Sequence, residues 1–302
     1  MSIDRVLLTG AGGFTGGFMR RELEAHGCEV VALGGRGGGS PDRSGDDLAV
    51  DLRDADAVRR AVLDTRPGFV VHLAAKAFVG HGSARDFYEV NLLGTRNLLD
   101  ALGALETPPS RVLLASSANV YGNASEGVLD ETATAQPAND YAVSKLAMEY
   151  VARLWTGRLP LIITRPFNYT GVGQTANFLI PKIVSHFRDR APTIELGNLD
   201  VWRDISDVRV VVEAYRRLLF SRDAVDVTVN VCSGVTHSLR EIVALCEAYT
   251  GHMIRVEVNP AFVRQNEVRV LSGDASRLES LVGPLEMPTL ADTIAWMMDA
   301  DA

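Results

Sequence analysis

Residues 5–16 read RVLLTGAGGFTG, an apolar run followed by a glycine-rich turn and the first residues of a helical pattern. We expect a strand at Arg5–Thr9 and a helix of about three turns at Phe14–His26. Gly10, Gly13 and Gly16 lack Cβ atoms, so the chain can turn tightly and a pyrophosphate can approach the free N–H groups of the helix start. A glycine triplet can be an ordinary turn, but its place between a strand and a helix predicts dinucleotide binding.

Short apolar runs and helical patterns alternate through the rest of the chain. The further predicted strands are Glu29–Leu33, Phe69–Leu73, Arg111–Ser116, Leu159–Thr164 and Val227–Val231. The further predicted helices are Ala55–Thr65, Phe87–Leu105, Tyr141–Trp155, Val208–Phe220, Leu239–Thr250 and Leu290–Ala300. Strands this continuously apolar are typical of a sheet covered by helices on both faces. The order predicts an α/β fold with a doubly wound parallel (Rossmann) sheet and a smaller α/β substrate-binding lobe.

The regular alternation of predicted strands and helices ends after Pro166. Residues 171–192 mix loop and helix signals. We expect a Rossmann domain over 1–170, completed by about 206–236, and a substrate-binding lobe made of 171–205 and 237–302. The chain would then cross between the two parts more than once.

The composition excludes several classes of function. The formal net charge is −8, with 38 acidic and 30 basic residues, which disfavours a nucleic-acid surface. Three distant cysteines, Cys28, Cys232 and Cys246, match neither a disulfide framework nor a zinc site and fit a reducing cytoplasm. The chain shows no signal-peptide pattern and no run near the ~18 apolar residues that span a bilayer. We therefore expect a soluble cytoplasmic protein.

The end of the second strand predicts which dinucleotide is bound. A carboxylate there would bind the ribose hydroxyls of NAD and repel a 2′-phosphate. This chain instead has Leu33-Gly34-Gly35-Arg36, with no acid until Asp42, and Arg36 could pair with a 2′-phosphate. NADP is therefore favoured, although Arg36 could equally be a solvated loop residue. Asp51-Leu52 could lie beside the adenine amino group, or Asp51 could simply precede a helix.

The segment from Tyr141 to Lys145 carries the most chemical information. Residues four apart share one face of a helix, so the phenol and the ammonium can meet. A nearby cation favours phenolate, so we expect Lys145 to lower the pKa of Tyr141 and let it exchange a proton with a carbonyl oxygen. Ser117 follows the predicted strand Arg111–Ser116, at the sheet edge where ligands bind, and could hydrogen-bond the same oxygen. The alternatives are a surface Tyr–Lys pair and a serine bonded to local backbone.

With these motifs the chain resembles the extended short-chain dehydrogenase/reductase family, particularly its nucleotide-sugar branch. The motifs that carry the resemblance are GxxGxxG at 10–16, HLAA at 72–75, NLLGT at 91–95, SSANVYG at 116–122, YAVSK at 141–145 and RPFN at 165–168. The resemblance implies that Ser117, Tyr141 and Lys145 are catalytic, that Lys145 also contacts the nicotinamide ribose and that Asn91 supports the lysine. The cofactor-binding residues expected are Gly10, Gly13, Phe14, Thr15, Gly16, Arg36, Asp51, Leu52, Leu73, Ala74, Ala75, Tyr141 and Lys145.

The resemblance also implies a nucleotide-sugar substrate and a homodimer. Asn168, Asn177, Arg203 and Arg264 match residues that bind the sugar nucleotide, and a diphosphate favours forked cationic donors. Each arginine alone would more often be a surface charge. The helices Phe87–Leu105 and Tyr141–Trp155 would form the dimer interface, although their apolar faces could equally be core.

Three reactions compete within this branch. A 4,6-dehydratase needs an acid just after the catalytic hydroxyl, where this chain has Ala118-Asn119. A 4-epimerase that retains NAD usually has an acid after the second strand. Both acids are missing, so we expect an NADPH-dependent reductase, with NADH possible. The segments 168–174, 197–208 and 273–278 are most similar to GDP-4-keto-6-deoxy-D-mannose reductases, whose products are GDP-D-rhamnose and GDP-6-deoxy-D-talose. A 4-epimerase and a non-catalytic NADP-binding sensor remain the alternatives.

Overall fold

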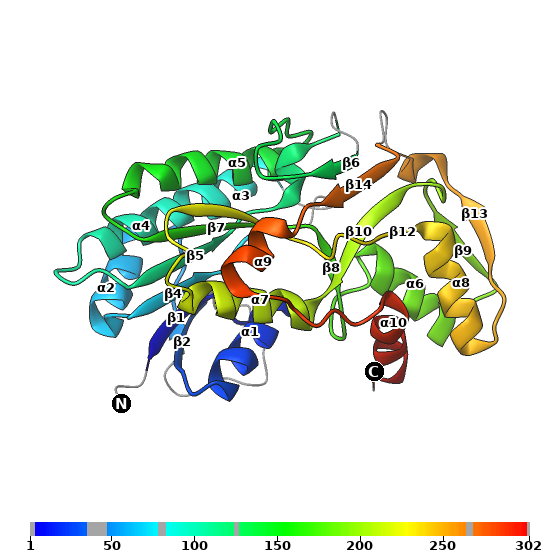
Figure 1. Ribbon diagram of the computed structural model, residues 1–302, viewed down its shortest axis with the longest axis horizontal. Coiled ribbons are helices and arrows are strands. Elements are labelled where there is room, and N and C mark those ends of the chain that lie inside the picture. The colour runs from blue at the N-terminus through cyan, green and yellow to red at the C-terminus, as the bar shows by residue number, and fades with distance from the viewer. Residues whose placement is uncertain (1–3, 35–46, 78–82, 124–126, 264–267, 301–302) are drawn as a thin grey trace.

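A parallel sheet of seven strands forms the larger part of the molecule (Figure 1). The computed structural model describes residues 4–34, 47–77, 83–123, 127–263 and 268–300. In spatial order the strands are β11 (Val227–Val231), β7 (Leu161–Pro166), β5 (Arg111–Ala115), β4 (Phe69–His72), β1 (Arg5–Thr9), β2 (Glu29–Gly34) and β3 (Leu48–Ala49). Every neighbouring pair is parallel. The predicted fold class is confirmed.

Helices cover both faces of this sheet because its strands are apolar on both sides. On β1, Val6 and Leu8 pack with α1 (Phe14–Ala25) and α7 (Val208–Phe220). Leu7 faces the other way, toward α2 (Ala55–Thr65), α4 (Thr95–Gly103) and α5 (Asp140–Ala152). The strand order reverses direction between β1 and β4, which is where ligands bind in such sheets.

The helix predicted at Phe87–Leu105 has a wider turn in its middle. α3 (Ala84–Phe87) leads into a π-helical segment, Tyr88–Gly94, and α4 follows. Apolar spacing cannot distinguish this segment from an α-helix, because both bury one face. The π-helical segment holds Asn91, which is almost fully buried.

A second group of elements forms the smaller part of the molecule. Its main sheet contains β6 (Gly127–Leu129), β8 (Asn168–Thr170), β10 (Trp202–Asp207), β12 (Thr236–Ser238) and β14 (Val270–Gly273). The parallel pair β9 (Thr193–Leu196) and β13 (Arg255–Val258) lies beside α6 (Leu179–Arg188), α8 (Leu239–Thr250) and α10 (Leu290–Asp299) (Figure 1). The sequence patterns missed these strands, since most have only three or four residues. α9 (Ser276–Val282) packs on α7 and β11 of the large sheet, and the domain limits remain a prediction.

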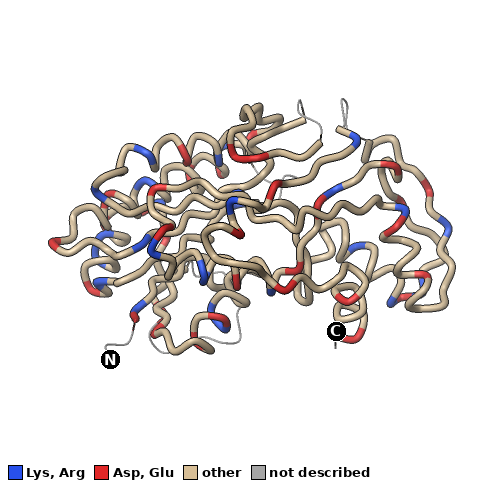
Figure 2. The backbone as a smooth tube through the Cα atoms, in the orientation of Figure 1, with Lys and Arg blue, Asp and Glu red and all other residues tan. Residues whose placement is uncertain are grey.

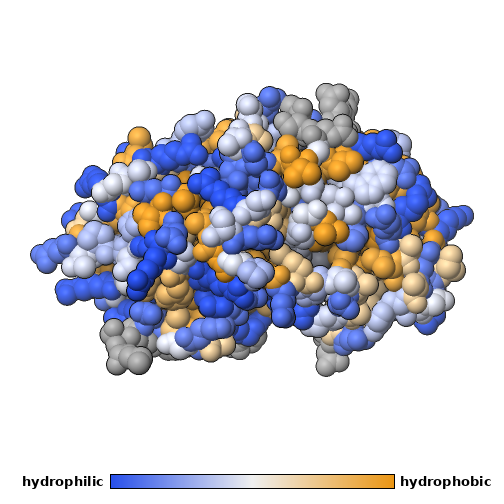
Figure 3. Space-filling view, viewed as in Figure 1, coloured by the Kyte–Doolittle hydropathy of each residue, from blue (hydrophilic) through white to orange (hydrophobic). Residues whose placement is uncertain are grey.

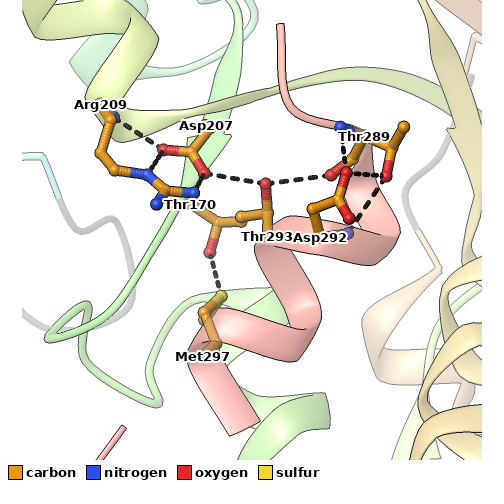
Figure 4. Close-up of polar contacts among 7 residues, drawn as sticks. All are labelled: Thr170, Asp207, Arg209, Thr289, Asp292, Thr293 and Met297. Atoms are coloured by element: carbon orange, nitrogen blue, oxygen red, sulfur yellow. Dashed lines mark hydrogen bonds and ion pairs between the residues drawn. The ribbon is translucent and has the colours of Figure 1, made fainter. Parts of the chain in front are cut away.

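The last helix, α10, is fastened by a buried carboxylate (Figure 4). Asp207 begins α7, and its carboxylate accepts two hydrogen bonds from the Arg209 guanidinium, at 3.0 and 2.7 Å. On its other side, the Thr293 hydroxyl of α10 donates to the same carboxylate at 2.9 Å. The Arg209 guanidinium also lies 3.9 Å from the ring centroid of Trp296, a favourable cation–π distance. One carboxylate therefore joins α7 of the large part to α10 of the small part.

A chain of hydrogen bonds links the ends of β1 and β4 to the π-helical segment. The Thr95 hydroxyl donates to the Asn91 carbonyl (2.7 Å), so it accepts from Nε2 of His72 (2.8 Å). The other ring nitrogen, Nδ1, then accepts from Thr9 (2.7 Å), whose oxygen accepts from the Ala74 N–H (3.2 Å). Burial and the charge of Lys145 lower the pKa of His72 to about 3, so the ring is neutral. This chain fixes the residues that follow β4.

Acidic and basic residues are interspersed along the chain (Figure 2). On the face drawn in Figure 3, apolar residues are exposed between hydrophilic ones. Among the described residues, none of the helices is long and apolar enough to cross a membrane.

Thr293→Val should destabilise the protein by about 2 kcal/mol, because a buried carboxylate loses a hydroxyl donor without a change in side-chain size. Urea unfolding measures the loss. Thr132→Val is the matched control, since Thr132 donates to Asp130 at the exposed surface, and it should cost less than about 0.5 kcal/mol. Equal losses in the two variants would show that the α10 contact has no special weight.

Acid should weaken the fold through His72. Its pKa is about 6.5 when unfolded and about 3 when folded, so the unfolded chain alone gains this proton as pH falls below ~6.5. Between pH 7 and 5 this group should remove about 2 kcal/mol from the free energy of unfolding. Urea unfolding of wild type and of His72→Gln tests this. The difference between their free energies of unfolding should be about 2 kcal/mol smaller at pH 5 than at pH 7. A difference that does not change with pH would contradict a buried neutral His72.

Candidate active site

The glycine turn after β1 leaves no room for side chains. Gly10 has a φ of 75°, and a Cβ there would lie 2.7 Å from the Ala74 nitrogen. A Cβ on Gly16 would lie only 2.0 Å from the Gly10 carbonyl oxygen, so the first turn of α1 can approach β1 only with glycine there. Gly13 caps α1 without a side-chain hydrogen bond, so the helix start is open to an anion. The turn has the geometry of a phosphate-binding loop.

A cleft of about 730 Å³ lies along this turn. Of the predicted cofactor residues, it is lined by Gly10, Gly13, Asp51, Leu52, Leu73, Ala74 and Ala75. The parallel strands explain this grouping, because the segments follow β1, β3 and β4 and therefore reach the same edge of the sheet. Phe14, Thr15 and Gly16 belong to the adjoining start of α1, whereas Arg36 lies outside the described residues.

The cleft contains charged residues that the sequence patterns did not indicate. Arg20, in the middle of α1, pairs with Asp47 at 2.7 Å, and both side chains are mostly buried. Neither lies in a recognisable motif, so only the fold brings them to the cleft. Asp51 accepts from Arg53 at 2.6 Å, and these hydrogen bonds lower the pKa of Asp51. Its predicted contact with an adenine amino group stays a prediction.

Tyr141 and Ser117 meet at the end of β5. Asn139 begins α5 by accepting a hydrogen bond from the Ala142 N–H, which places Tyr141 in the first turn. Ser117 accepts from the backbone and the side-chain amide of Asn119, at 3.2 and 3.1 Å. Loss of water raises the pKa of Tyr141 to about 12, although a hydrogen bond with Ser117 opposes this rise. The phenol is therefore protonated at neutral pH.

The expected effect of Lys145 on Tyr141 is wrong for this structure. Burial outweighs any attraction, so the tyrosine's pKa is raised rather than lowered. The Lys145 ammonium donates to the Ala115 carbonyl at 2.7 Å. Burial also lowers the pKa of Lys145 to about 8, partly offset by the negative charge of Glu149. Helical spacing placed the pair on one face, but the dielectric surroundings depend on the whole fold.

Asn91 is hydrogen-bonded to Lys76 and Ser144. Its side-chain oxygen accepts from the Lys76 N–H at 2.8 Å, and its nitrogen donates to the Lys76 carbonyl and the Ser144 hydroxyl, at 3.1 and 3.0 Å. It therefore holds the segment after β4 against α5. Its support of Lys145 stays a prediction.

The predicted substrate residues lie in the smaller part of the molecule. Asn168 begins β8 and donates to the Asp204 carbonyl of β10 at 3.2 Å. Arg203 precedes Asp204 on the same strand, and its guanidinium donates to the Val268 carbonyl at 2.9 Å. Asn177 is exposed in the loop before α6, and Arg264 lies outside the described residues. Their sugar-nucleotide contacts stay predictions.

Tyr169, which no motif indicated, connects the predicted substrate-binding segment to the predicted cofactor-binding residues at the start of α1. Its ring stacks on Phe14 with centroids 6.3 Å apart, and its hydroxyl lies 2.9 Å from that of Thr15. Both partners belong to the glycine turn, whereas Tyr169 follows Asn168 in β8. A single aromatic residue in a three-residue strand gives no signal of such a contact in the sequence.

Comparisons with known proteins agree with this geometry. Residues 7–284 match the family model described as GDP-mannose 4,6 dehydratase. A GDP-6-deoxy-D-talose 4-dehydrogenase from Aggregatibacter actinomycetemcomitans is 34% identical, over 92% of this chain and 91% of its own length. A GDP-6-deoxy-D-mannose reductase from Pseudomonas aeruginosa is 36% identical over 72% of this chain and 74% of its own.

Solved structures show the same architecture. A Burkholderia cenocepacia protein provisionally described as an epimerase is 50% identical with a TM-score of 0.92, covering 98% of this chain and 97% of its own. Two others have TM-scores of 0.84 and cover 98% of this chain. One is a Pseudomonas aeruginosa structure labelled RMD, complexed with NADPH, with 30% identity over 96% of its own chain. The other is a Thermus thermophilus UDP-glucose 4-epimerase complexed with NAD, with 28% identity over 98% of its own chain.

The family match covers most of the chain and includes both the glycine turn and the Tyr141–Lys145 helix. This chain therefore belongs to the GDP-mannose 4,6-dehydratase family of extended short-chain dehydrogenases/reductases, as its motifs predicted.

Proposed function

We propose that this protein reduces the 4-keto group of a GDP-linked 4-keto-6-deoxy sugar with NADPH, giving GDP-D-rhamnose or GDP-6-deoxy-D-talose. The observation that carries the proposal is the protonated Tyr141 phenol, hydrogen-bonded with Ser117 at the carboxyl end of β5. A group with its proton in place is suited to donate it to a carbonyl oxygen. The names of the two relatives that act on GDP-6-deoxy sugars support the choice of substrate.

The cleft residues fit a nicotinamide dinucleotide. The uncapped start of α1 and the Cβ-free approach at Gly10 and Gly16 suit a pyrophosphate. Bound there, NADPH would supply hydride to the carbonyl carbon. NADPH is favoured over NADH because the sequence after Leu33 reads Gly34-Gly35-Arg36, with no acid until Asp42, and the NADPH complex of the related structure supports this choice.

Three side chains would complete the reduction. As the carbonyl carbon accepts hydride, the Tyr141 hydroxyl donates its proton to the carbonyl oxygen, so that ketone becomes alcohol. Ser117 hydrogen-bonds the same oxygen and polarises it. The phenolate left on Tyr141 would be stabilised by the Lys145 ammonium, which is buried and belongs to the next turn of α5. Asn168, Asn177, Arg203 and Arg264 would bind the sugar nucleotide.

Other reactions of the family fit less well. A dehydratase needs an acid next to the catalytic hydroxyl, but Ala118 and Asn119 stand there, and Asn119 is bonded to Ser117. A 4-epimerase is the second candidate, favoured by the description of the 50% identical structure. Interconversion of sugar nucleotides by the purified protein without added cofactor would select the epimerase.

We further propose a cytoplasmic homodimer. The expected interface helices expose apolar residues: Leu93 is 50% exposed, Tyr150 60% and Leu154 71%. A second copy would cover this face, whereas packing within one chain leaves it in water. The three cysteines are free thiols, as in a reducing compartment.

The reaction can be tested with GDP-4-keto-6-deoxy-D-mannose and either NADPH or NADH. We expect oxidation of NADPH and a 6-deoxy product whose configuration at carbon 4 is read by NMR. Absence of turnover with both cofactors would reject the reductase proposal.

Tyr141→Phe should reduce turnover by about 10²–10⁴-fold, since the proton donor is lost while the ring is kept. NADPH affinity, measured by calorimetry, should stay close to that of wild type. Tyr249→Phe is the control, because Tyr249 lies on α8 and bonds to Asp299. Near-normal turnover in Tyr141→Phe would remove the tyrosine from the mechanism.

Leu93→Glu combined with Leu154→Glu should convert the dimer to a monomer, because two like charges per copy would be buried against each other. Light scattering measures the mass. Met253→Glu, a change at a residue that is 74% exposed in the smaller part, should leave the mass unchanged. A wild-type monomer would contradict the proposed dimer directly.

A further inference from the structure

Glu149 is a fully buried carboxylate one helical turn beyond Lys145. Tyr141, Lys145 and Glu149 are spaced by four residues, so they share the face of α5 that meets the end of β5. Three consecutive residues bind this face. The Ala115 carbonyl accepts from Lys145 at 2.7 Å, the Ser116 hydroxyl donates to Glu149 at 2.6 Å, and Ser117 is hydrogen-bonded with Tyr141.

A second strand holds Glu149 from the other side. Arg165 of β7 donates to both carboxylate oxygens, from Nε at 3.0 Å and from Nη2 at 2.7 Å. Burial by itself would lower the pKa of Arg165. The hydrogen bonds and the charge of Glu149 outweigh this effect and raise the pKa of Arg165. The Arg165 guanidinium also donates to Tyr121, whose hydroxyl donates to Asn230 of β11. The position of the carboxylate is thus fixed from two sides, by Ser116 after β5 and by Arg165 of β7.

A buried ion pair such as Glu149–Arg165 is costly if its only role is to hold two elements together. Removing two charges from water costs several kcal/mol, and apolar residues of similar size often stabilise a core as well or better. We therefore expect the charge of this buried pair to have a role beyond stabilising the core. Lys145 is also buried, and an isolated ammonium there would lose its proton near neutral pH.

The other ionisable groups around Lys145 do not supply a negative charge. His72 of β4 is neutral, and the positive charge of Lys145 helps to keep it so. Other charged and polar groups on the elements packed against α5 have partners of their own: Tyr88 with Asp140, Glu89 with Arg85, Asp100 with Arg96, and Tyr121 with Arg165. Asp86 of α3 acts on the Arg53 guanidinium. Arg153, one turn beyond Glu149, lies 3.6 Å from its carboxylate at the surface.

We propose that Glu149, clamped by Ser116 and Arg165, is a positioning residue that keeps Lys145 protonated at working pH and holds Ser117 in register with Tyr141. The inference rests on the proposed roles of Tyr141 and Lys145. Glu149 touches neither substrate nor cofactor and acts through the lysine. In support, burial brings the pKa of Lys145 down to about 8, and the charge of Glu149 limits the fall.

The protonation of Lys145 determines how turnover should depend on pH. Lys145 stabilises the phenolate only while protonated, so turnover should fall as pH rises past its pKa. Glu149→Gln removes the negative charge, so the pKa of Lys145 should fall and this alkaline limb should move about one pH unit toward acid. Glu149→Asp keeps the charge and should keep the limb near its wild-type place. Ser116→Ala should lower kcat without moving the limb.

The test combines activity with a direct titration of the lysine. The chain has only three lysines, Lys76, Lys145 and Lys182, so NMR of isotope-labelled lysine resolves Lys145, assigned with Lys145→Arg. Asp100→Asn is the control for loss of one negative charge, since Asp100 is an exposed residue of α4. Its Lys145 titration should match wild type.

Glu149→Gln leaves Arg165 buried without an anion, so Glu149→Gln/Arg165→Gln is made in parallel to remove the unbalanced charge. Both should lower the pKa of Lys145. An unchanged Lys145 titration in whichever of the two folds would overturn the proposal. A shifted titration in a protein without activity on 4-keto sugars would instead reject the proposed function and leave the role of Glu149 standing.

Discussion

The constraint on which this structure depends is that all seven strands of its large sheet run in the same direction. Their carboxyl ends therefore lie at one edge, and the segments that follow them are brought together there. Thr9 and His72 end β1 and β4, whereas Ser117 and Asn168 follow β5 and β7 of the same sheet. Helices must return across both faces, which is why the strands are apolar on both sides. The site is a consequence of how the core is buried.

The close approach at the glycine turn adds a second restriction. A Cβ at Gly16 would overlap the Gly10 carbonyl, so α1 can begin against β1 only when both positions are glycine. This contact leaves the uncapped helix start facing the cleft. Tyr169 then packs on Phe14 and bonds to Thr15, so the segment that carries Asn168 is aligned on the same turn. The predicted cofactor-binding and substrate-binding residues are therefore tied to one short stretch of backbone.

On α5, the helix that carries the predicted catalytic residues Tyr141 and Lys145, ionisable side chains are buried rather than exposed at the surface. Tyr141, Lys145 and Glu149 lie one turn apart, and their neighbours on β5 are consecutive residues. Withdrawal of water raises the tyrosine's pKa and lowers that of the lysine. The first change suits the proposed reduction, because the phenol holds its proton until the carbonyl oxygen takes it. The second is opposed by the charge of Glu149. In the role that we propose for it, Glu149, held by Ser116 and Arg165, supplies the negative charge that such a buried lysine needs.

Local pattern was sufficient for the main architecture and for the identity of the family. The limits of β1, α2, α7, β11 and α8 match the predicted ranges, because their apolar periodicity and flanking turns are encoded within each segment. The glycine spacing and the Tyr141–Lys145 spacing are local too. Tertiary structure alone decided the rest: the direction of the Tyr141 pKa shift, the partners of Asn91, the Arg20–Asp47 pair and the clamp on Glu149. Each depends on the solvent exclusion or the close approach of segments far apart in the chain, and no local pattern carries that information.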